Sequence, residues 1–400
     1  MPVGTPFHER TFARAESLNY REWSGFYTVS AYEAHHEHEY NAIRNAVALI
    51  DVSPLYKYLV TGADATRLVD RVVTRDMNTV AVGQVIYTPW CAADGLVIDD
   101  GTVSRLGEQR YRWTAADPTL RWLRLNARGL DVQVDEVSEQ VAALAVQGPL
   151  SGALLSEVAE ADVAGLKYFR VTSGTVAGVR VDISRTGYTG DLGYEVWIPA
   201  DSALRVWDVL VDVGRRHGVR PAGMLALDVA RIEAGLLLTD VDFFSCRKAL
   251  VTSQFYTPFE MGLGRLVHVN KAPFVGQQAL AEEARSGPRR LIVGLEIDWH
   301  RFESLHERAN LPPQVPAAAS RVAVPVYKDG AQVGRATSTA WSPTLKKLIA
   351  LATIASGLAD PGTMVDLEVT VDATRHRVPA RVVKTPFLNP PRKTGVAASR

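Results

Sequence analysis

Two adjacent carboxylates, Asp99 and Asp100, stand where an apolar run at residues 96–98 ends, just before Gly101. Neighbouring side chains on a strand point to opposite faces, so at most one of the two can face a shared pocket. A carboxylate at the end of a buried strand is costly unless it is paired or hydrogen-bonded. The pair is therefore either an exposed turn at a strand end or a site in which one aspartate does chemistry.

A third carboxylate, Glu195, lies in a segment that alternates strictly. Tyr194, Val196 and Ile198 share one face of the predicted strand, and Glu195 and Trp197 share the other. A carboxylate flanked by two aromatic rings can clamp a planar group with two adjacent donors, such as the amino group and ring N–H of a pterin. The solvated face of an edge strand is an equally good interpretation of the pattern.

Asp228, Arg231 and Glu233 lie on one predicted helix. Asp228 and Arg231 are three residues apart, so they can pair on one face of that helix. A structural ion pair is the simpler interpretation. The alternative is an arginine fork that holds a substrate carboxylate.

Other polar motifs carry less chemistry. His35, His36 and His38 fit a solvated helix face better than a metal site, and we expect no bound metal. The Gly-rich run at residues 186–190 leads from one predicted strand into another, so no helix N-terminus receives an anion there. We therefore expect no phosphate-binding loop of the nucleotide-binding types.

The bulk composition favours a globular cytoplasmic protein with a sizeable core. The chain has 400 residues, of which 47% are apolar, with 44 basic and 44 acidic side chains. Such a balance argues against a dedicated nucleic-acid binder. Cys91 and Cys246 are far apart in sequence and are expected to be separate buried thiols. Residues 1–20 do not form a signal peptide, and no apolar run is long enough to span a membrane.

Local patterns predict the elements that position these residues. We expect helices at residues 34–45, 63–73, 119–127, 204–218 and 223–237, the first with His36, Glu37 and Glu39 on its polar face. Strands are expected at 56–62 and 111–114, with hairpins at 84–100 and 179–198. The first 35 residues show little periodicity. The fold class is α+β.

The last quarter of the chain has a different pattern. A proline- and alanine-rich linker at residues 309–319 precedes short alternating segments at 322–326, 348–354, 365–371 and 378–383. These segments predict a small all-β domain. Residues 389–400 are expected to form a mobile tail.

Taken together, seven segments resemble, in order, the aminomethyltransferase (glycine cleavage T-protein) family. The segments are HEYNAIR at 38–44 with DVS at 51–53, ADGLVIDD at 93–100, VQGP at 146–149, residues 185–195, residues 228–235, FVGQQAL at 274–280 and residues 337–345. Each match alone is weak, but the ordered set is specific. It spans most of the chain, about residues 36–385.

The resemblance implies a three-domain ring around a central channel that holds tetrahydrofolate. We expect two interleaved α+β domains within residues 1–290, a C-terminal β-barrel domain at 291–388 and the tail at 389–400. Asp100 is the favoured catalytic residue, with Asp99 as its partner. Asp100 would orient the accepting folate nitrogen, stabilise developing positive charge and relay a proton.

The resemblance also assigns cofactor-binding residues. Glu195 would clamp the pterin edge, and Tyr87, Tyr188 and Trp113 would line the cofactor pocket. The benzoyl-glutamate tail is assigned to Arg231 and to one of Arg375 or Arg377.

Departures from the family pattern bear on the substrate. Thr114 stands where the family often has asparagine, Arg265 replaces a tryptophan, and residues 239–249 do not look like the glycine-cleavage form. These changes favour a demethylase-type enzyme that moves a one-carbon unit from a small methylated or aminomethylated donor to tetrahydrofolate. The alternatives are an aminomethyltransferase acting on a lipoyl carrier protein and a non-enzymatic folate-binding homologue. Pro273 replaces the cysteine that such non-enzymatic relatives carry.

Overall fold

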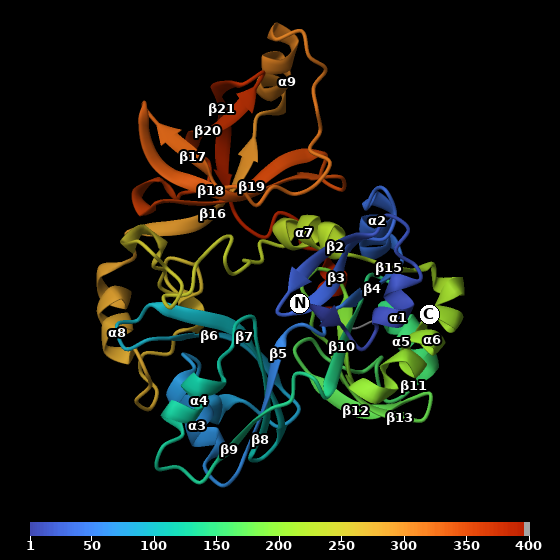
Figure 1. Cartoon of the computed structure of the whole chain (residues 1–400). Coiled ribbons are helices and arrows are strands. Elements are labelled where there is room, and N and C mark those ends of the chain that lie inside the picture. The colour runs from blue at the N-terminus through green and yellow to red at the C-terminus, as the bar shows by residue number, and fades with distance from the viewer. Residues whose placement is uncertain (396–400) are drawn as a thin grey trace.

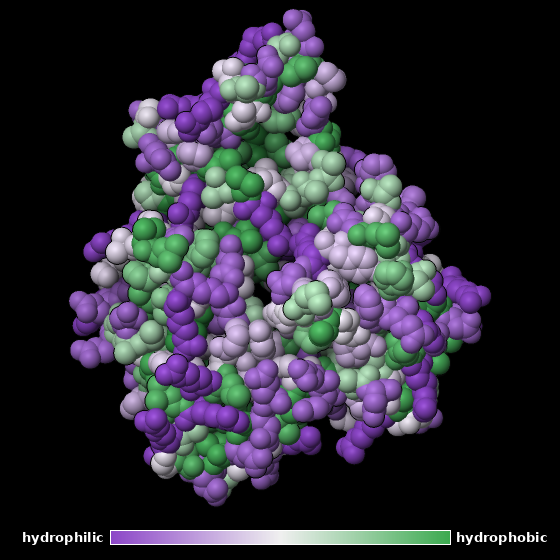
Figure 2. All heavy atoms as spheres, viewed as in Figure 1, coloured by the Kyte–Doolittle hydropathy of each residue, from purple (hydrophilic) through white to green (hydrophobic). Residues whose placement is uncertain are grey.

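The computed structural model describes residues 1–395, which form three bodies around a common centre. Two bodies are built on open sheets and the third is a closed barrel (Figure 1). The space-filling view shows a hollow where the three bodies meet (Figure 2). This α+β architecture with a C-terminal barrel confirms the predicted fold class.

The first sheet has the order β6-β7-β8-β5-β9. Its strands are β5 (Tyr56–Thr61), β6 (Val85–Cys91), β7 (Val97–Gly107), β8 (Arg110–Ala115) and β9 (Gln133–Glu136). Helices α3 (Ala65–Val72) and α4 (Leu120–Asn126) cover one face. A core that includes Ile86, Val103 and Trp113 fills the space beneath them, because alternate residues of each strand point that way.

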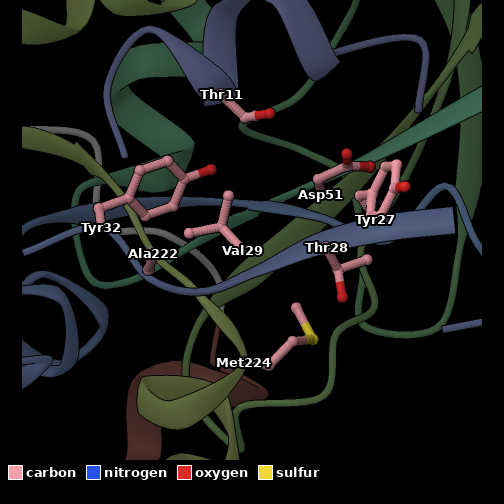
Figure 3. A pocket seen from close by; sticks show the side chains of 8 residues that line it. All are labelled: Thr11, Tyr27, Thr28, Val29, Tyr32, Asp51, Ala222 and Met224. Carbon is pink, nitrogen blue, oxygen red and sulfur yellow. The ribbon is translucent and has the colours of Figure 1, made fainter. Parts of the chain in front are cut away.

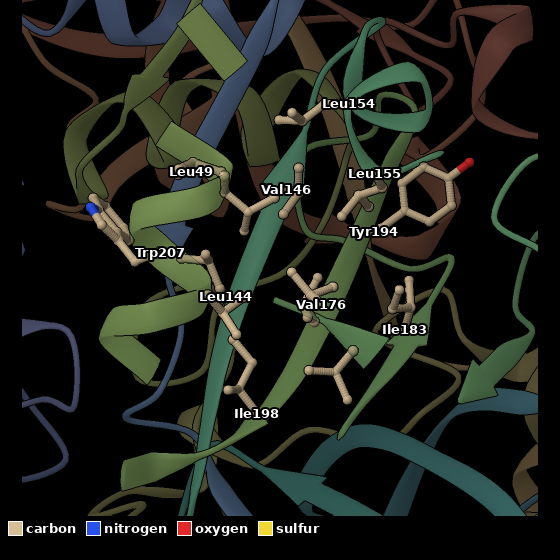
Figure 4. Close-up of a cluster of buried hydrophobic side chains, with 14 of the residues drawn as sticks. Leu49, Leu144, Val146, Leu154, Leu155, Val176, Ile183, Tyr194, Ile198 and Trp207 are labelled. Carbon is tan, nitrogen blue, oxygen red and sulfur yellow. The ribbon is translucent and has the colours of Figure 1, made fainter. Parts of the chain in front are cut away.

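The second sheet has the order β11-β12-β13-β14-β10-β4-β15. Its strands are β4 (Val47–Asp51), β10 (Val141–Gln147), β11 (Ala159–Glu160), β12 (Val171–Val176), β13 (Val179–Ser184), β14 (Gly193–Pro199) and β15 (Val219–Pro221). Helices α5 (Ser151–Val158) and α6 (Ala203–Gly214) pack on one face through the cluster in Figure 4, which contains Tyr194, Ile198 and Trp207. Helices α2 (Glu37–Asn45) and α7 (Met224–Glu233) pack on the other face, where Trp197 lies. The two-faced pattern predicted around Glu195 is therefore confirmed.

The barrel closes in the order β16-β19-β18-β17-β20-β21. Its strands are β16 (Arg290–Ile297), β17 (Val324–Lys328), β18 (Ala331–Ser342), β19 (Lys347–Ala355), β20 (Met364–Val371) and β21 (Thr374–Val383). Helix α8 (Gln277–Ser286) precedes the barrel, and α9 (Trp299–Arg308) follows its first strand. Strands β16 and β18 were not predicted from local alternation, and the domain boundary placed between residues 290 and 291 stays a prediction.

Two expectations for the N-terminal region need correction. Residues 1–35 contain a small sheet of β1 (Val3–Gly4), β3 (Phe26–Ala31) and β2 (Asn19–Trp23), together with α1 (His8–Phe12). Glu39 is predicted on the polar face of its helix, but it is buried and accepts hydrogen bonds from the backbone N–H groups of Tyr32 and Gly223. Glu39 thereby joins segments that lie far apart in the sequence.

Two expectations about chain ends and helix ends also change. Helix α7 stops at Glu233 rather than continuing to residue 237, because Gly235 adopts a left-handed conformation with φ 65°. Residues 389–395 of the predicted mobile tail are docked, since Arg392 pairs with Asp191 on the second-sheet body. Residues 396–400 of that tail lie outside the described part of the chain.

Candidate functional site

One face of the first sheet carries polar side chains at successive pairing positions. Antiparallel pairing sets Tyr87 opposite Thr102, Pro89 opposite Asp100, Ser104 opposite Arg112 and Lys57 opposite Thr114. Alternation sends all of them to the face opposite the α3 and α4 core. The two faces of this sheet are therefore chemically distinct, and the polar one is turned toward the second-sheet body.

Asp100 and Tyr87 form a hydrogen-bonded pair on this polar face, with the Tyr87 hydroxyl donating to Asp100 Oδ2. Burial raises the pKa of Asp100 to about 6, although the Tyr87 hydrogen bond opposes the rise. Burial, with the neighbouring Asp100 charge, raises the pKa of the Tyr87 hydroxyl well above its ordinary value. Tyr87 therefore remains a donor, and Asp100 is poised to change its protonation state near neutral pH.

Asp99 points the other way and is fully buried. Its Oδ2 accepts the backbone N–H groups of Ala116 and Asp117, both at 3.0 Å, and its Oδ1 accepts the Asp100 N–H at 2.8 Å. Burial and the Asp100 charge raise the pKa of Asp99, with the backbone hydrogen bonds opposing them. The alternation argument thus separates the two aspartates. Asp99 organises the loop before α4, and Asp100 lies on the face that is turned toward the second-sheet body.

Glu195 belongs to the facing surface of the second sheet. Its Oε2 accepts the Thr186 hydroxyl, and its Oε1 accepts no hydrogen bond from residues 1–395. Burial raises the pKa of Glu195, opposed by the Thr186 hydrogen bond and by the positive charge of Arg112. One oxygen of this carboxylate is therefore available to a ligand.

Tyr188 lies on the same loop as Thr186 and donates its hydroxyl to the Leu237 carbonyl. Burial raises the pKa of Tyr188, and the charge of Asp100 adds to the rise. Tyr87, Asp100 and Tyr188 are therefore close enough to act on one another electrostatically. The structure brings these three predicted residues together.

Arg112 joins the two sheets and was missed by the sequence analysis. Its Nη1 donates to Asp182 Oδ2 at 2.7 Å, and its guanidinium carbon lies 4.3 Å from the centre of the Trp197 ring. Its Nε and Nη2 are buried without a hydrogen-bond partner among residues 1–395. The signal was present in the sequence, because Arg112 and Thr114 alternate with the apolar Tyr111 and Trp113.

Trp113 is placed on the other face from Asp100. It is fully buried, and its ring centre lies 5.0 Å from that of Trp90 in an edge-on contact. The same alternation that sends Arg112 toward the second sheet sends Trp113 into the core against α3 and α4. This position gives Trp113 a packing role and corrects its assignment to the cofactor pocket.

Arg231 is enclosed by its own ion pairs. It is fully buried, with Nη1 2.6 Å from Asp242, Nε 3.5 Å from Asp228 and Nη2 donating to Ser338 at 2.8 Å. Asp242 belongs to the segment 239–249 that departs from the family pattern. The simpler interpretation from sequence, a structural ion pair, describes this geometry. Asp242 of the segment 239–249 is the main partner of Arg231.

Arg375 and Arg377 lie on β21 of the barrel. Arg375 pairs with Glu368 at 2.8 Å while largely exposed, and Arg377 stacks over the Tyr327 ring at 3.9 Å. Neither residue contacts the residues around Asp100. Their assignment to the folate tail stays a prediction.

Two hollows lie away from the facing surfaces of the two sheets. A cavity of about 10 Å³, lined by Tyr27, Tyr32, Asp51 and Met224 among others, has room for roughly one water molecule (Figure 3). A groove along α4 of about 650 Å³ is lined by Arg121, Arg124, Arg128 and three less polar residues. Neither includes a residue predicted for catalysis. Within residues 1–395, no cluster of three His, Cys, Asp or Glu side chains is arranged to hold a metal ion, and no helix is long and apolar enough to cross a membrane.

The facing surfaces combine the parts of a small-molecule site. The facing surfaces of the two sheets carry a carboxylate whose pKa burial raises to about 6, a carboxylate with a free oxygen, two tyrosines and an arginine with unused donors. Groups with perturbed pKa values and unsatisfied buried donors gather where ligands bind. Such a surface can hold a planar polar molecule and exchange a proton with it.

Comparisons with known proteins match almost the whole chain. The family model described as the GCVT N-terminal domain covers residues 6–271, and that of the glycine cleavage T-protein C-terminal barrel domain covers residues 311–389. Similar proteins include an aminomethyltransferase from Bacillus subtilis, 35% identical over 87% of this chain and 90% of that protein. A trimethylamine-oxide aldolase from Ruegeria pomeroyi is 36% identical over 98% of this chain, which spans 48% of that longer protein.

A solved structure shows the same fold. The crystal structure of the glycine cleavage system aminomethyltransferase T from Bartonella henselae has a TM-score of 0.81 and covers 97% of this chain and 99% of that one. Sequence identity between the two is 23%. The arrangement of the three bodies is therefore shared with that enzyme.

Proposed function

Because this chain is an enzyme of the aminomethyltransferase (glycine cleavage T-protein) family, we propose that it transfers a one-carbon unit to tetrahydrofolate. The donor is a small methylated or aminomethylated molecule, and the acceptor is N5 of the folate. The observation that carries the proposal is the opposition of Asp100, Tyr87 and Arg112 on the first sheet to Glu195 on the second.

The residues on the two facing surfaces fit tetrahydrofolate. The free Oε1 of Glu195 suits the adjacent amino and ring N–H donors of a pterin, and the unused N–H groups of Arg112 suit an acceptor. Tyr87 and Tyr188 supply aromatic surface beside Asp100. Tetrahydrofolate, when bound, supplies a nucleophilic ring nitrogen that accepts the one-carbon unit.

Asp100 performs the central step in this proposal. As a carboxylate in a desolvated site it stabilises positive charge that develops on the reacting nitrogen. With a pKa raised to about 6, it also takes up or returns a proton at neutral pH. The Tyr87 hydroxyl holds the carboxylate in place, and Glu195 sets the orientation of the ring.

Two observations support a small donor. Asp242 anchors the segment 239–249 in the protein interior, because its carboxylate binds Arg231 and the hydroxyls of Thr337 and Ser338. The trimethylamine-oxide aldolase relative carries a small methylated amine oxide in its name and matches 98% of this chain. We infer from them a demethylase-type reaction.

The second candidate is the glycine-cleavage reaction, in which an aminomethyl group is carried on a lipoyl protein. The aminomethyltransferase relatives favour it, since they match 87–89% of this chain and about 90% of their own length. A direct comparison separates the two reactions. One assay supplies small methylated amines with tetrahydrofolate, and the other supplies an aminomethylated lipoyl protein. The folate product of each assay is then identified as 5-methyl- or 5,10-methylene-tetrahydrofolate.

The proposed function is tested by anaerobic calorimetry of tetrahydrofolate binding to wild type and to Glu195→Ala. Glu160→Ala is the matched control, because Glu160 also accepts a threonine hydroxyl on the same sheet but is exposed. We expect wild type and the control to bind and Glu195→Ala to lose affinity. Absence of binding to wild type would overturn the proposal.

A further inference from the structure

The segment that follows the barrel, residues 384–395, crosses back to the second-sheet body, and we name it the C-terminal strap. It leaves β21 and passes α7 on its way to the second-sheet body (Figure 1). The Leu388 N–H donates to the Glu233 carbonyl at the end of α7 at 2.9 Å. Beyond this point the strap reaches the loop between β13 and β14.

Arg392 is the main anchor of the strap. Its Nε and Nη2 contact the two carboxylate oxygens of Asp191 at 2.6 and 2.8 Å, and Nη2 also donates to the Arg44 carbonyl. The Asp191 side chain has no exposed surface. A two-pronged guanidinium–carboxylate contact with a buried acid fixes both position and orientation.

The loop holds the strap in return. Arg185, almost fully buried at the start of the loop, donates through Nη2 to the carbonyls of Arg392, Lys393 and Gly395. Its Nη1 donates to the Leu166 carbonyl at 3.0 Å. Two arginines, one from each segment, therefore cross-link the strap and the loop at both ends of residues 185–191.

This loop carries the side chains of the facing surface. Thr186, which follows Arg185, donates to Glu195, and Tyr188 lies between the two cross-links. Gln147 of β10 provides further support from inside, because its side chain donates to the Thr186 carbonyl and accepts the Thr189 hydroxyl. The outer side of the loop is held by the strap.

We propose that the C-terminal strap positions the cofactor-binding loop, with Arg392 acting through Asp191 as the positioning residue. The inference rests on the proposed function, since Thr186, Tyr188 and Glu195 are assigned to tetrahydrofolate there. Arg392 does not touch the ligand. Its removal loosens the loop and so weakens folate binding without changing the groups that contact the folate.

The test compares wild type, Arg392→Ala and Arg392→Lys by anaerobic calorimetry with tetrahydrofolate and by amide hydrogen exchange. Arg10→Ala is the matched control, because Arg10 makes the same two-pronged contact with Asp208 on the surface of the same body. We expect Arg392→Ala to bind roughly tenfold more weakly, the size of effect that one anchoring contact has on affinity. In Arg392→Ala, amide hydrogen exchange should rise within residues 186–191. Arg392→Lys should recover part of the tetrahydrofolate affinity. The Arg10→Ala control should match wild type in both measurements.

A double-mutant cycle sharpens the test. Asp191→Asn should reproduce the loss, and in the double variant the loss should be less than the sum of the two single losses, because both changes break the Arg392–Asp191 contact, although Asp191 also pairs with Arg44 at 3.3 Å. Unchanged folate affinity in Arg392→Ala would overturn the inference. Exchange that rises uniformly along the chain, with an equal drop in thermal stability, would also overturn it, because Arg392 would then be merely structural.

The two proposals fail in different ways. If wild type binds no tetrahydrofolate, the proposed function is wrong, while exchange in residues 186–191 still reports on the strap. A rise confined to that loop in Arg392→Ala supports the strap, and no rise overturns it. If wild type binds and Arg392→Ala binds equally well, the strap inference fails and the proposed function stands.

Discussion

Two regions of this enzyme bury charges, and they treat those charges differently. Around α7, Glu233 accepts hydrogen bonds from Tyr40, Arg44 and Ser342, and Asp242 accepts from Arg231, Thr337 and Ser338. Between the two sheets, Glu195 keeps a free oxygen and Arg112 keeps two nitrogens without partners among residues 1–395. Both carboxylates of the first region are fully engaged, whereas Glu195 in the second is not.

This difference separates buried charges that have a structural role from buried charges that are available to a ligand. Buried carboxylates that accept several hydrogen bonds hold the second-sheet body and the barrel together, since α2 and α7 of the former and strand β18 of the latter all contribute to the α7 region. An unused buried donor costs about 1–3 kcal/mol. Both regions contain an arginine with a buried N–H that makes no hydrogen bond with residues 1–395, Arg231 Nε in the first and Arg112 Nε and Nη2 in the second, so the free carboxylate oxygen of Glu195 is what tells them apart.

The Asp100→Asn variant gives the strongest test of the difference between the two regions. We expect turnover to fall by about 10²–10⁴-fold, because the variant neither carries charge nor exchanges a proton. Thermal stability should stay close to wild type, since the amide oxygen of the introduced asparagine can still accept the Tyr87 hydrogen bond. Steady-state rates with the donor found by screening, together with thermal unfolding, check both parts. A large loss of stability with little loss of turnover would show that Asp100 has a structural role, like Glu233 in the α7 region.

The opposite result is expected for Glu233→Gln in the α7 region. Removing this charge leaves Arg44, whose side chain is 4% exposed, without its main partner. Breaking a buried ion pair on one side costs about 3–5 kcal/mol. Urea denaturation measures the change, with Glu296→Gln, which loses an exposed pair with Lys347, as the control. A loss no larger than that of the control would remove the distinction between the regions.

Asp99→Asn separates the two adjacent aspartates. The amide cannot accept on both sides, so either the Asp100 N–H or the N–H groups of Ala116 and Asp117 lose their acceptor. We expect a loss of about 1–3 kcal/mol in the free energy of unfolding. Turnover should fall far less than in Asp100→Asn when both are assayed well below the melting temperature. Equal losses of turnover would overturn the assignment by strand face.

The smallest effect concerns pH. Because burial raises the pKa of Asp100 to about 6, its carboxylate is present above that pH and is lost as pH falls through it. One unit below, roughly a tenth of the molecules are ionised, so kcat/KM should drop about tenfold. A pH–rate profile of wild type should show this acidic limb. An unchanged limb in Asp100→Asn would assign the titration to another group.

Local sequence determined much of this arrangement. The adjacent positions of Asp99 and Asp100 on one strand separated their side chains, and alternation along 194–198 placed Glu195 and Trp197 together. Gly218, in a left-handed conformation with φ 66°, ends the helical stretch of α6 and its last turn as predicted. The ordered motifs identified the family. These features depend on neighbours along the chain, whose geometry is set by the period of a strand or the end of a helix.

Only the tertiary structure decided which segments meet. Arg112 lies 70 residues from Asp182, and Arg392 lies 201 residues from Asp191, so no local period connects either pair. The same holds for Glu39, which the sequence places on the polar face of a helix and whose backbone partners, Tyr32 and Gly223, only the fold brings to it. The sequence by itself determined the face on which each side chain lies. The folded structure determined what lies opposite that face, because partners across sheets are chosen by packing among distant segments.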